Sequence, residues 1–385
     1  MVEAAEEAEI AAERSGDAVA IAEAQHKAEE AAAKARAAEQ AAVAAAEAVA
    51  TRTTTRKALS HKPHKVINEL IKMYSFQPVR TERGELVNVV LVRAPFRSPR
   101  EKQMFEKYKN EILFIGICSF EDFPIPPQNP FSGRFPKNEY TGIFPGWLHM
   151  FREPEKIFPK HVKLLLMSQS DFSLPDEGRR MEKKYDFVYS GSDQDVHNNC
   201  VGWASFAKNW SFMLDSLKVM CGELGMTGVL VATKDKSGKK ACTIPKECEG
   251  KMVQTTFLDQ GKFFEYARQS RFAFFPQIHD ASPRVTTQAL SLNLPLLVNW
   301  HIMGGWKYVI EGETGEFFHD MSDFRDAVKR IRSGVATGKY HPRKLIDDQY
   351  GDAHQGPRLK RWIQENFADR VKLPPGTSML LPTGA

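Results

Sequence analysis

Long apolar runs are missing from this chain of 385 residues, and cysteine is scarce. No stretch reaches the roughly 18 consecutive apolar residues of a membrane span, and the first residues lack the apolar core of a secretion signal. The five cysteines include no C-x-x-C pair, which argues against a zinc site or a disulfide scaffold. We therefore expect reduced thiols and a cytoplasmic location, although a Cys242–Cys248 bridge is conceivable. The chain could also be a soluble fragment of a membrane-anchored protein.

Charge is distributed unevenly. The whole chain carries a formal net charge of +5, but residues 1–50 contain ten Glu and one Asp against two Lys and two Arg. The remainder is therefore strongly basic, and a basic body suits an anionic small molecule, a nucleic acid or a membrane surface. With 42% hydrophobic and 26% charged residues, that body has the composition of a globular protein.

Residues 1–50 are rich in alanine, with 23 of them. Ala, Glu, Lys and Arg favour helix, so a helical arm interrupted near Gly16 and Asp17 is expected. Its other apolar residues are too sparse for a heptad seam. We interpret it as a solvated spacer, with a weak coiled coil or a partner-binding helix as the alternative. Residues 51–65 hold five Lys and Arg and no acid, which indicates a basic hinge or a tether to a membrane or partner.

The body divides into two α/β domains and a C-terminal helix. Residues 66–180 predict a small domain with strands near 86–94, 112–120 and 162–170 and helices at 66–74 and 98–111. Residues 181–335 predict strands near 184–192, 227–233 and 253–257 alternating with helices at 201–224 and 261–269. This alternation is typical of a parallel, doubly wound sheet. Residues 336–385 are expected to form a helix that crosses back onto the first domain, and a tail.

Residues 271–319 carry the most informative pattern. Strand Phe272 to Phe275 is followed by a polar loop, a helix opening at Ser282-Pro283, a second strand, and Gly304-Gly305. Ser282 can cap the helix and proline suits its first turn, which leaves free amides and Arg284 facing an anion. In open parallel sheets, ligands bind at the carboxyl ends of strands. Phosphate is the expected guest, and an ordinary βαβ crossover is the alternative.

The order of residues in this segment resembles the donor-binding half of GT-B glycosyltransferases of the glycogen-synthase-like, retaining group (group 1, family 4). The pattern is Asp280, then Gln288 at the eighth position with Ala289 after it, then Leu294-Pro295, a strand and the Gly-Gly loop. The likeness extends over about residues 185–335. Its SPR and GGWKY blocks are similar to those of algal and large-virus glycosyltransferases. The implied fold is α/β with two Rossmann-like domains, the second binding the donor.

The resemblance implies roles for several residues. The first acid of the pattern, here Asp280, touches hydroxyls of the donor sugar, and the second holds the nucleotide ribose. Gln288 replaces that second acid, which keeps an acceptor and adds a donor. Gly191 corresponds to the tight turn beneath the donor phosphates, and Lys208 to a basic residue on the pyrophosphate.

The Gly-Gly loop has an implied role as well. In the family the amides of this loop, Gly304 and Gly305 here, contact the donor sugar, and Lys307 could reach a phosphate. Ser282 and Trp306 are counted among the expected donor-binding residues, although for Trp306 and Tyr308 packing between the domains is an equally good interpretation.

Two further sets of residues were weighed against structural roles. Asp193-Gln194-Asp195 is a D-x-D sequence, but polar residues separate it from its strand, so no metal site is expected. His149 and Asp171 follow strands of the first domain. An inverting enzyme would need one of them as a general base, whereas a retaining enzyme would not.

The sequence thus predicts a glycosyltransferase that moves a sugar from a nucleoside-diphosphate sugar to a glycan, lipid or protein acceptor. We expect a retaining reaction with no metal, no cofactor beyond the donor, and no nucleic-acid partner. Asp280, Arg284 and Lys208 are the expected catalytic residues. A GT-B-fold sugar-nucleotide epimerase and a non-catalytic adaptor acting through the helical arm are the alternatives.

Overall fold

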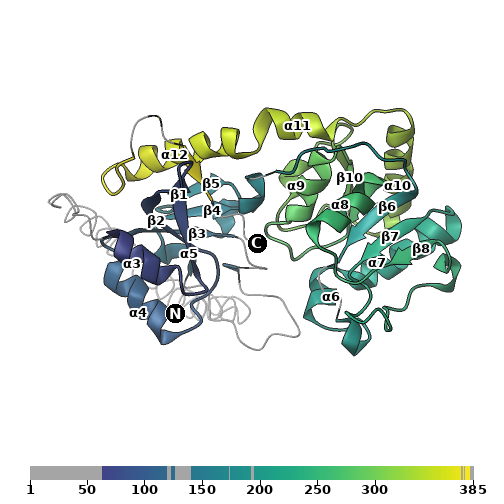
Figure 1. Cartoon of the computed structure of the whole chain (residues 1–385), viewed down its shortest axis with the longest axis horizontal. Helices are drawn as coiled ribbons and strands as arrows, with labels where there is room; N and C mark the ends of the chain where they lie inside the picture. The colour runs from purple at the N-terminus through teal and green to yellow at the C-terminus, as the bar shows by residue number, and fades with distance from the viewer. Residues whose placement is uncertain are drawn as a thin grey trace, which may run out of the picture. The chain divides into compact units, whose positions relative to one another are not determined.

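The computed structural model describes residues 63–118, 123–125, 140–172, 174–191, 195–373, 376 and 378–381. In this part the chain forms two six-stranded sheets with flanking helices (Figure 1). Each sheet with its helices is called a lobe below. The arm expected at 1–50 and most of the basic hinge lie outside the described residues. The last three hinge residues are not a linker, because helix α3 (Pro63–Leu70) begins there.

The first lobe has strand order β12-β1-β2-β3-β4-β5. The strands are β1 (Phe76–Thr81), β2 (Leu86–Val92), β3 (Leu113–Ile117), β4 (Gly146–His149), β5 (Lys163–Leu166) and β12 (Met379–Leu380). β2 to β5 run parallel, while β1 pairs antiparallel with both β2 and β12. Helix α4 (Pro99–Tyr108) starts where expected, because the Ser98 side chain accepts a hydrogen bond from the Glu101 amide. Short helix α5 (Tyr140–Ile143) precedes β4.

The C-terminal helix does return to the first lobe. After α11 (Pro342–Gln349), helix α12 (Asp352–Phe367) buries Leu359, Trp362 and Ile363 in the apolar cluster formed by β2 and β3. Figure 1 shows α12 lying along this sheet. The chain therefore begins and ends its described part in the same lobe.

The second lobe is an all-parallel sheet with order β11-β10-β9-β6-β7-β8. Its strands are β6 (Tyr185–Ser190), β7 (Gly228–Val231), β8 (Met252–Gln254), β9 (Ser270–Phe275), β10 (Leu296–Asn299) and β11 (Gly315–Phe318). Neighbouring residues of β9 enter different cores: Phe272 and Phe274 pack in one cluster, Ala273 and Phe275 in the other. A strand whose two faces are both covered reads as continuously apolar, which is why β9 was recognisable in the sequence.

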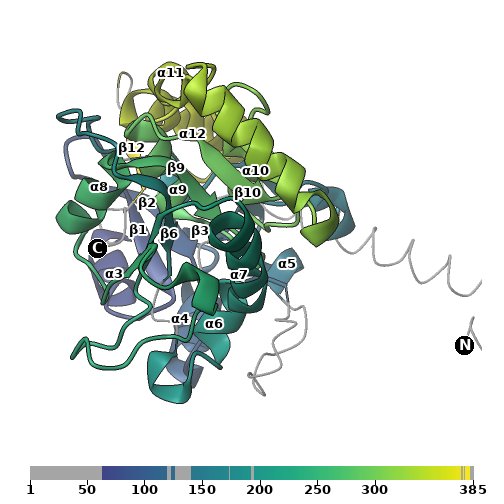
Figure 2. The ribbon, with the colours of Figure 1, turned by 90° about the vertical axis from the view of Figure 1, so that its right-hand side faces the viewer.

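Helices cover both faces of this second sheet. Figure 2 shows α8 (Gln260–Arg268) and α9 (Arg284–Ser291) on one side and α7 (Trp210–Leu217) and α10 (Met321–Ala336) on the other. The apolar clusters agree with this view. Residues of α7 and α10 pack in the same cluster as Phe272, and residues of α8 and α9 pack in the same cluster as Ala273. The expected doubly wound sheet is confirmed.

The helix expected at residues 201–224 is interrupted. Helix α6 (Trp203–Ala207) ends at Lys208, and α7 begins after Asn209, which has a left-handed backbone with φ of 52°. The Asn209 side-chain amide donates a 3.0 Å hydrogen bond to the carbonyl of Pro276. Asn209 and Pro276 are 67 residues apart in the sequence. Helical periodicity could not reveal the break, because a tertiary contact holds it.

Four of the five cysteines form disulfides. Cys200 pairs with Cys242 and Cys221 with Cys248, with Cα–Cα distances of 5.7 and 5.3 Å. Cys118 is buried without a disulfide, and its burial raises the pKa of its thiol. The expectation of reduced thiols is therefore wrong for these four, and Cys242 does not pair with Cys248. One apolar cluster of the second lobe brings together these partners, which lie 42 and 27 residues apart in the sequence, so their positions along the chain did not reveal the pairing.

Among the described residues, no helix combines the length and the apolar character that crossing a bilayer requires.

Candidate functional site

The predicted site residues gather where β6, β9 and β10 of the second sheet end. Gly191 follows β6, and its amide donates to the Val231 carbonyl at 3.1 Å. Residues 276–283 connect β9 to α9, and residues 300–308 follow β10. Parallel strands end at the same edge of a sheet, so these three segments share one edge, the usual place for ligands in open α/β sheets.

An ion pair joins two predicted catalytic residues at this edge. The Lys208 ammonium lies 2.7 Å from Oδ2 of Asp280, and the two side chains are only 15% and 17% exposed. Lys208 is held at the end of α6, just before the Asn209 kink, while Asp280 lies in the loop after β9. The structure thus brings together residues 72 positions apart, and their charges offset one another.

Helix α9 begins at Arg284, which is exposed. The expected cap by Ser282 is wrong, because the cap position is Pro283 and no side chain caps the helix. The Ser282 hydroxyl instead lies 2.9 Å from that of Ser170 in the first lobe. Within the first turn, the Thr286 amide donates a 3.2 Å hydrogen bond to the Pro283 carbonyl. Gln288 is half-buried one turn further along the helix.

The two glycines of the Gly-Gly loop are required by their surroundings. A Cβ on Gly304 would come within 2.1 Å of the Ala281 carbonyl oxygen, and the Gly304 amide donates to the Asp280 carbonyl at 2.9 Å. Gly305 has φ of +83°, and a Cβ there would come within 2.5 Å of the Pro283 ring. The loop therefore packs directly on the segment that carries Asp280, which only glycine allows.

Lys307 is engaged away from the ion pair of Lys208. Its ammonium lies 2.5 Å from Oδ2 of Asp171, and its side chain is 7% exposed. The Tyr308 hydroxyl donates to Oδ1 of Asp171 at 2.5 Å, and the Ser168 amide donates to Oδ2 at 2.9 Å. Burial lowers the pKa of Lys307, while Asp171 acts in the opposite direction. The structure thus ties Lys307 to a fully buried carboxylate of the first lobe.

Trp306 also contacts the first lobe. Its indole Nε1 donates a 2.7 Å hydrogen bond to the Met150 carbonyl. The guanidinium of Arg152 lies 4.6 Å from the Trp306 ring and 3.9 Å from that of Trp300. These contacts favour the interpretation of Trp306 as a packing residue between the lobes.

The acidic residues of the D-x-D sequence are only partly described. Asp193 and Gln194 lie outside the described residues, while Oδ2 of Asp195 accepts a 2.9 Å hydrogen bond from the Ser205 amide. This carboxylate is therefore occupied at the start of α6. In the part of the chain that the structure describes, no three His, Cys, Asp or Glu residues form a group that could hold a metal ion.

His149 stands at the carboxyl end of β4 and is 6% exposed. Burial, and next the charge of Lys307, lower its pKa to about 4, so the imidazole is neutral at neutral pH. Its Nδ1 has no hydrogen-bond partner within the described residues. Asp171, the other acceptor-side candidate, is completely buried with both oxygens hydrogen-bonded.

Two residues of the loop after β9 were missed by the sequence analysis. Gln277 is 0% exposed, and neither amide atom has a hydrogen-bond partner among the described residues. His279 stacks on Phe206, with ring centroids 4.7 Å apart. A buried amide without partners is costly, so Gln277 is a candidate to bind a ligand. The available signal was a polar residue directly after an apolar strand.

Comparison with known proteins detects likeness in structure only. No family model matches the chain, and no curated protein matches it. The crystal structure of TarM superposes with a TM-score of 0.51 at 10% identity, covering 81% of this chain and 59% of TarM. Sucrose-phosphate synthase from Thermosynechococcus elongatus gives 0.50 at 10% identity, covering 70% and 72% of the two chains.

The chain thus spans less than two thirds of the TarM structure that it matches. Identities this low are informative about the fold and about nothing finer. The fold of this chain comprises two α/β lobes, an all-parallel second sheet and a C-terminal helix that returns to the first lobe, and the two superpositions cover most of the chain. The chain has the GT-B fold.

Proposed function

We propose that this protein is a retaining, metal-independent glycosyltransferase that uses a nucleoside-diphosphate sugar as donor. The observation that carries the proposal is the Lys208–Asp280 pair at the carboxyl edge of a parallel sheet, beside the start of α9. A cation, a carboxylate and a helix start at one edge fit a ligand with both phosphates and sugar hydroxyls.

The diphosphate would bind to the positive groups of this edge. In the proposed complex, Arg284 at the start of α9 turns toward the same phosphates as Lys208, and the helix dipole adds a partial positive charge there. When the glycosidic bond breaks, negative charge grows on the leaving nucleoside diphosphate. Lys208 and Arg284 would stabilise that charge, the kind of electrostatic stabilisation that often contributes most to catalysis.

Asp280 and Gln288 would hold the rest of the donor. In the proposed complex the Lys208 ammonium turns to a phosphate, which frees the Asp280 carboxylate to accept hydrogen bonds from sugar hydroxyls. Gln288, one turn into α9, would bind the ribose. Gly191 and the Gly304-Gly305 loop would allow the phosphates and the sugar to approach the backbone closely.

The environments of His149 and Asp171, the two candidates for a general base on the acceptor side, support a reaction that retains the anomeric configuration. An inverting enzyme needs a general base that reaches the acceptor hydroxyl. Both oxygens of Asp171 are already occupied in a buried cluster, and His149, with a pKa of about 4, is a weak base. A retaining reaction places no such demand on the first lobe. As acceptor we propose a glycan, a lipid or a protein, and we propose that the enzyme is related to algal and large-virus glycosyltransferases.

The test is a screen of nucleoside-diphosphate sugars by thermal stabilisation, followed by NMR analysis of the products. A donor should raise the melting temperature by mass action and yield a glycoside with the anomeric configuration of the donor. Activity should survive EDTA, and Asp193→Ala should have a small effect. Isomerised donor without transfer would indicate an epimerase, and absence of donor binding would indicate an adaptor. Metal-dependent activity would contradict the proposed phosphate site.

A further inference from the structure

A cavity of about 680 Å³ lies at the other end of the strands of the second sheet. Its walls come from the residues before β6, the first residues of β9, and the last turns of α10. β6 and β9 begin beside this cavity and end beside Lys208 and Asp280, so the strands separate it from the proposed donor site. Nothing in the proposed transfer reaction uses it.

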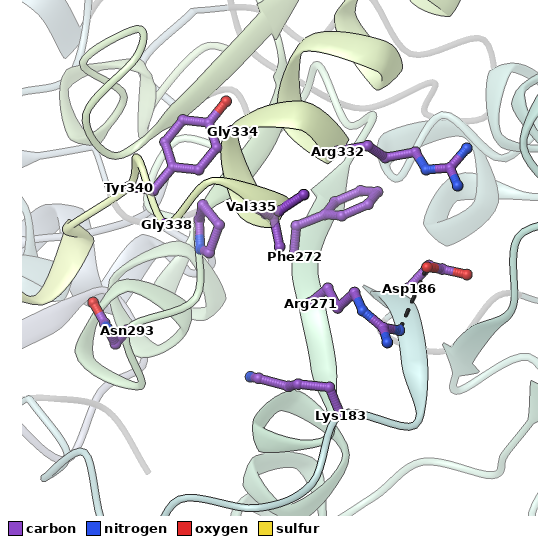
Figure 3. A pocket seen from close by; sticks show the side chains of 12 residues that line it. Lys183, Asp186, Arg271, Phe272, Asn293, Arg332, Gly334, Val335, Gly338 and Tyr340 are labelled. Atoms are coloured by element: carbon purple, nitrogen blue, oxygen red, sulfur yellow. Dashed lines mark ion pairs between the residues drawn. The ribbon is translucent and has the colours of Figure 1, made fainter.

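Cations dominate one side of the cavity. Figure 3 shows the side chains of Arg271 and Arg332 extending from β9 and α10 toward the side of Asp186, while that of Lys183, on the segment before β6, extends the other way. The single carboxylate of the lining, Asp186, lies 3.5 Å from the Arg271 guanidinium. Within the described residues, no hydrogen bond or ion pair joins the Arg332 guanidinium to another side chain. The lining therefore carries more positive charge than its own acid can offset.

A smaller hollow of about 270 Å³ extends this positive surface. It shares Lys183 and Asn293 with the first cavity and adds Arg179, Arg180 and Arg268, against one acid, Glu177. The Lys183 ammonium donates a 2.7 Å hydrogen bond to the Ser270 carbonyl. Burial of this ammonium, and next the charges of Arg271 and Arg180, lower the pKa of Lys183. The arginines around Lys183 add positive charge beside the first cavity.

The remaining wall is apolar. Phe272 and Val335 lie between Arg271 and Arg332 in Figure 3, and the Tyr340 ring stands opposite. The Tyr340 ring is fixed, because its hydroxyl donates to Glu316 at 2.7 Å and it packs against Gly334, where a Cβ would lie 2.4 Å from the ring. Phe272 and Tyr340 are only 1% and 7% exposed, so the apolar surface open to the cavity comes from half-buried Val335 and exposed Ala336. Inorganic phosphate would leave these two side chains in contact with water. A ligand that uses the whole cavity therefore has a phosphate and a ring.

We propose that this cavity binds a soluble organic phosphate, with the phosphate on Arg271 and Arg332 and a ring against Val335 and Ala336. Guanidinium groups suit phosphate, since their N–H groups can donate two parallel hydrogen bonds. Pockets of 300 to 1,000 Å³ are typical of small-molecule sites. The proposal stands apart from the proposed glycosyl transfer, because the two sites share no residue.

Calorimetric titration of the full chain with AMP, and separately with inorganic phosphate, tests this assignment. Arg332→Ala and Arg271→Ala should each weaken AMP binding by about tenfold or more, as expected for loss of a charge-assisted hydrogen bond. The control is Arg361→Ala, an exposed arginine on α12 in the other lobe, which should bind AMP as the wild type does. Hydrogen exchange should slow at residues 270–273 and 332–340 when AMP is bound.

Each alternative outcome contradicts the proposal. Absence of AMP binding, or equal weakening by Arg361→Ala, would mean no site or only diffuse charge attraction. If Lys208→Ala lost AMP binding while folded Arg332→Ala bound AMP as the wild type does, the ligand would lie in the proposed donor site instead. Equal affinity for AMP and inorganic phosphate would show that the apolar wall does not contribute to binding and would contradict the proposed ring contact. Arg271→Ala also breaks the ion pair with Asp186, so melting curves of both variants must show a folded protein. If Arg271→Ala is unfolded, the result for Arg332→Ala decides the test.

Discussion

At the scale of single residues, the acid that pairs with each lysine near the carboxyl ends of the strands determines whether that lysine can bind a ligand. Asp280 holds Lys208 at a partly exposed position, while Asp171 holds Lys307 in a fully buried one. The first pair can exchange partners when an anion arrives, because water and ligand reach it. The second is buried with Tyr308, and breaking a pair of this kind by removing one partner typically costs about 3 to 5 kcal/mol. Lys208 is therefore the better candidate for phosphate and Lys307 for joining the lobes.

His149 should make the protein less stable in acid. Its folded pKa of about 4 lies below the unfolded value of 6.5, so the unfolded chain binds more protons between these pH values. Its contribution to stability is full above pH 6.5 and is lost as the pH falls toward 4, about 2 kcal/mol of it between pH 7 and 5. Urea unfolding of wild type and His149→Gln at both pH values measures this term.

The variant should lose about 2 kcal/mol less than the wild type over the same pH interval. His161→Gln, which changes an exposed histidine of the same lobe, is the control and should keep the full acid loss. An unchanged pH dependence in His149→Gln would show that this imidazole is not the group that titrates.

At the scale of elements, the site is built from one strand end, one helix start and one glycine loop that contact each other. Gly304 touches the Ala281 backbone, Gly305 touches Pro283, and the Gly304 amide binds the Asp280 carbonyl. The position of Asp280 thus depends on the loop after β10 as well as on its own loop.

Gly304→Ala should therefore destabilise the second lobe. The new methyl would overlap the Ala281 carbonyl oxygen, and overpacking of this kind costs about 1 to 3 kcal/mol. Gly261→Ala is the matched control, because Gly261 is exposed near the start of α8 and its Cβ would meet no atom closer than 3.4 Å. That change should be neutral or slightly stabilising in urea unfolding. Equal stability of the two variants would mean that the glycine loop is not held as described.

The sequence predicted elements well where periodicity was local. The strands β2, β3, β6 and β9 were recognisable from apolar runs, and helix α4 lies within the helix expected at 98–111. Strand β1 was missed, since Pro78 and Arg80 interrupt its apolar pattern, and so was the two-residue β12. The kink at Asn209 and the true partner of Ser282 could not be predicted, because both depend on contacts with distant segments.

The candidate site was predictable in its location but not in its pairings. Residue order placed Asp280, Arg284 and the glycine pair at one sheet edge. It could not predict that Lys208 would pair with Asp280 or Lys307 with Asp171, since these contacts span 72 and 136 residues. Gln277 was overlooked because a single amide carries no pattern.

The disulfides give an element-scale prediction that chemistry can check directly. Unfolded in guanidinium without reductant, the protein should expose one thiol, that of Cys118, to Ellman's reagent, and five after reduction. Loss of the cross-links should lower the free energy of unfolding by about 2 to 4 kcal/mol for each disulfide. Five reactive thiols before reduction would support the original expectation from the sequence and contradict both bridges.

At the scale of the whole molecule, the two lobes meet through loops that follow the carboxyl ends of their strands. Ser168 to Asp171 after β5, and Met150 and Arg152 after β4, contact the start of α9 and residues 300–308. A buried ion pair, a tyrosine hydroxyl and an indole N–H are among these contacts. Helix α12 adds a second connection, because the chain returns through α11 to pack on the first sheet.

The N-terminal segment should be dispensable for the stability and the activity of the two lobes. Its sequence lacks an apolar face, and most helical stability in proteins comes from packing such a face. A chain that begins at His61, just ahead of α3, should keep the melting temperature and the transfer rate on a soluble acceptor. Location or assembly is what it could lose. An unfolded or inactive protein would mean that the segment packs on the body and that the spacer interpretation is wrong.

The most direct test of the central claim, that the donor phosphates bind beside α9, is kcat/KM for the donor in charge-removing variants. Arg284→Ala should lower kcat/KM more than tenfold with the fold intact, because one charge-assisted contact is worth about 2 to 3 kcal/mol. Lys208→Ala should show a smaller loss, and Arg361→Ala none. Wild-type kcat/KM in both folded variants, Arg284→Ala and Lys208→Ala, would contradict the claim and remove both residues from the site.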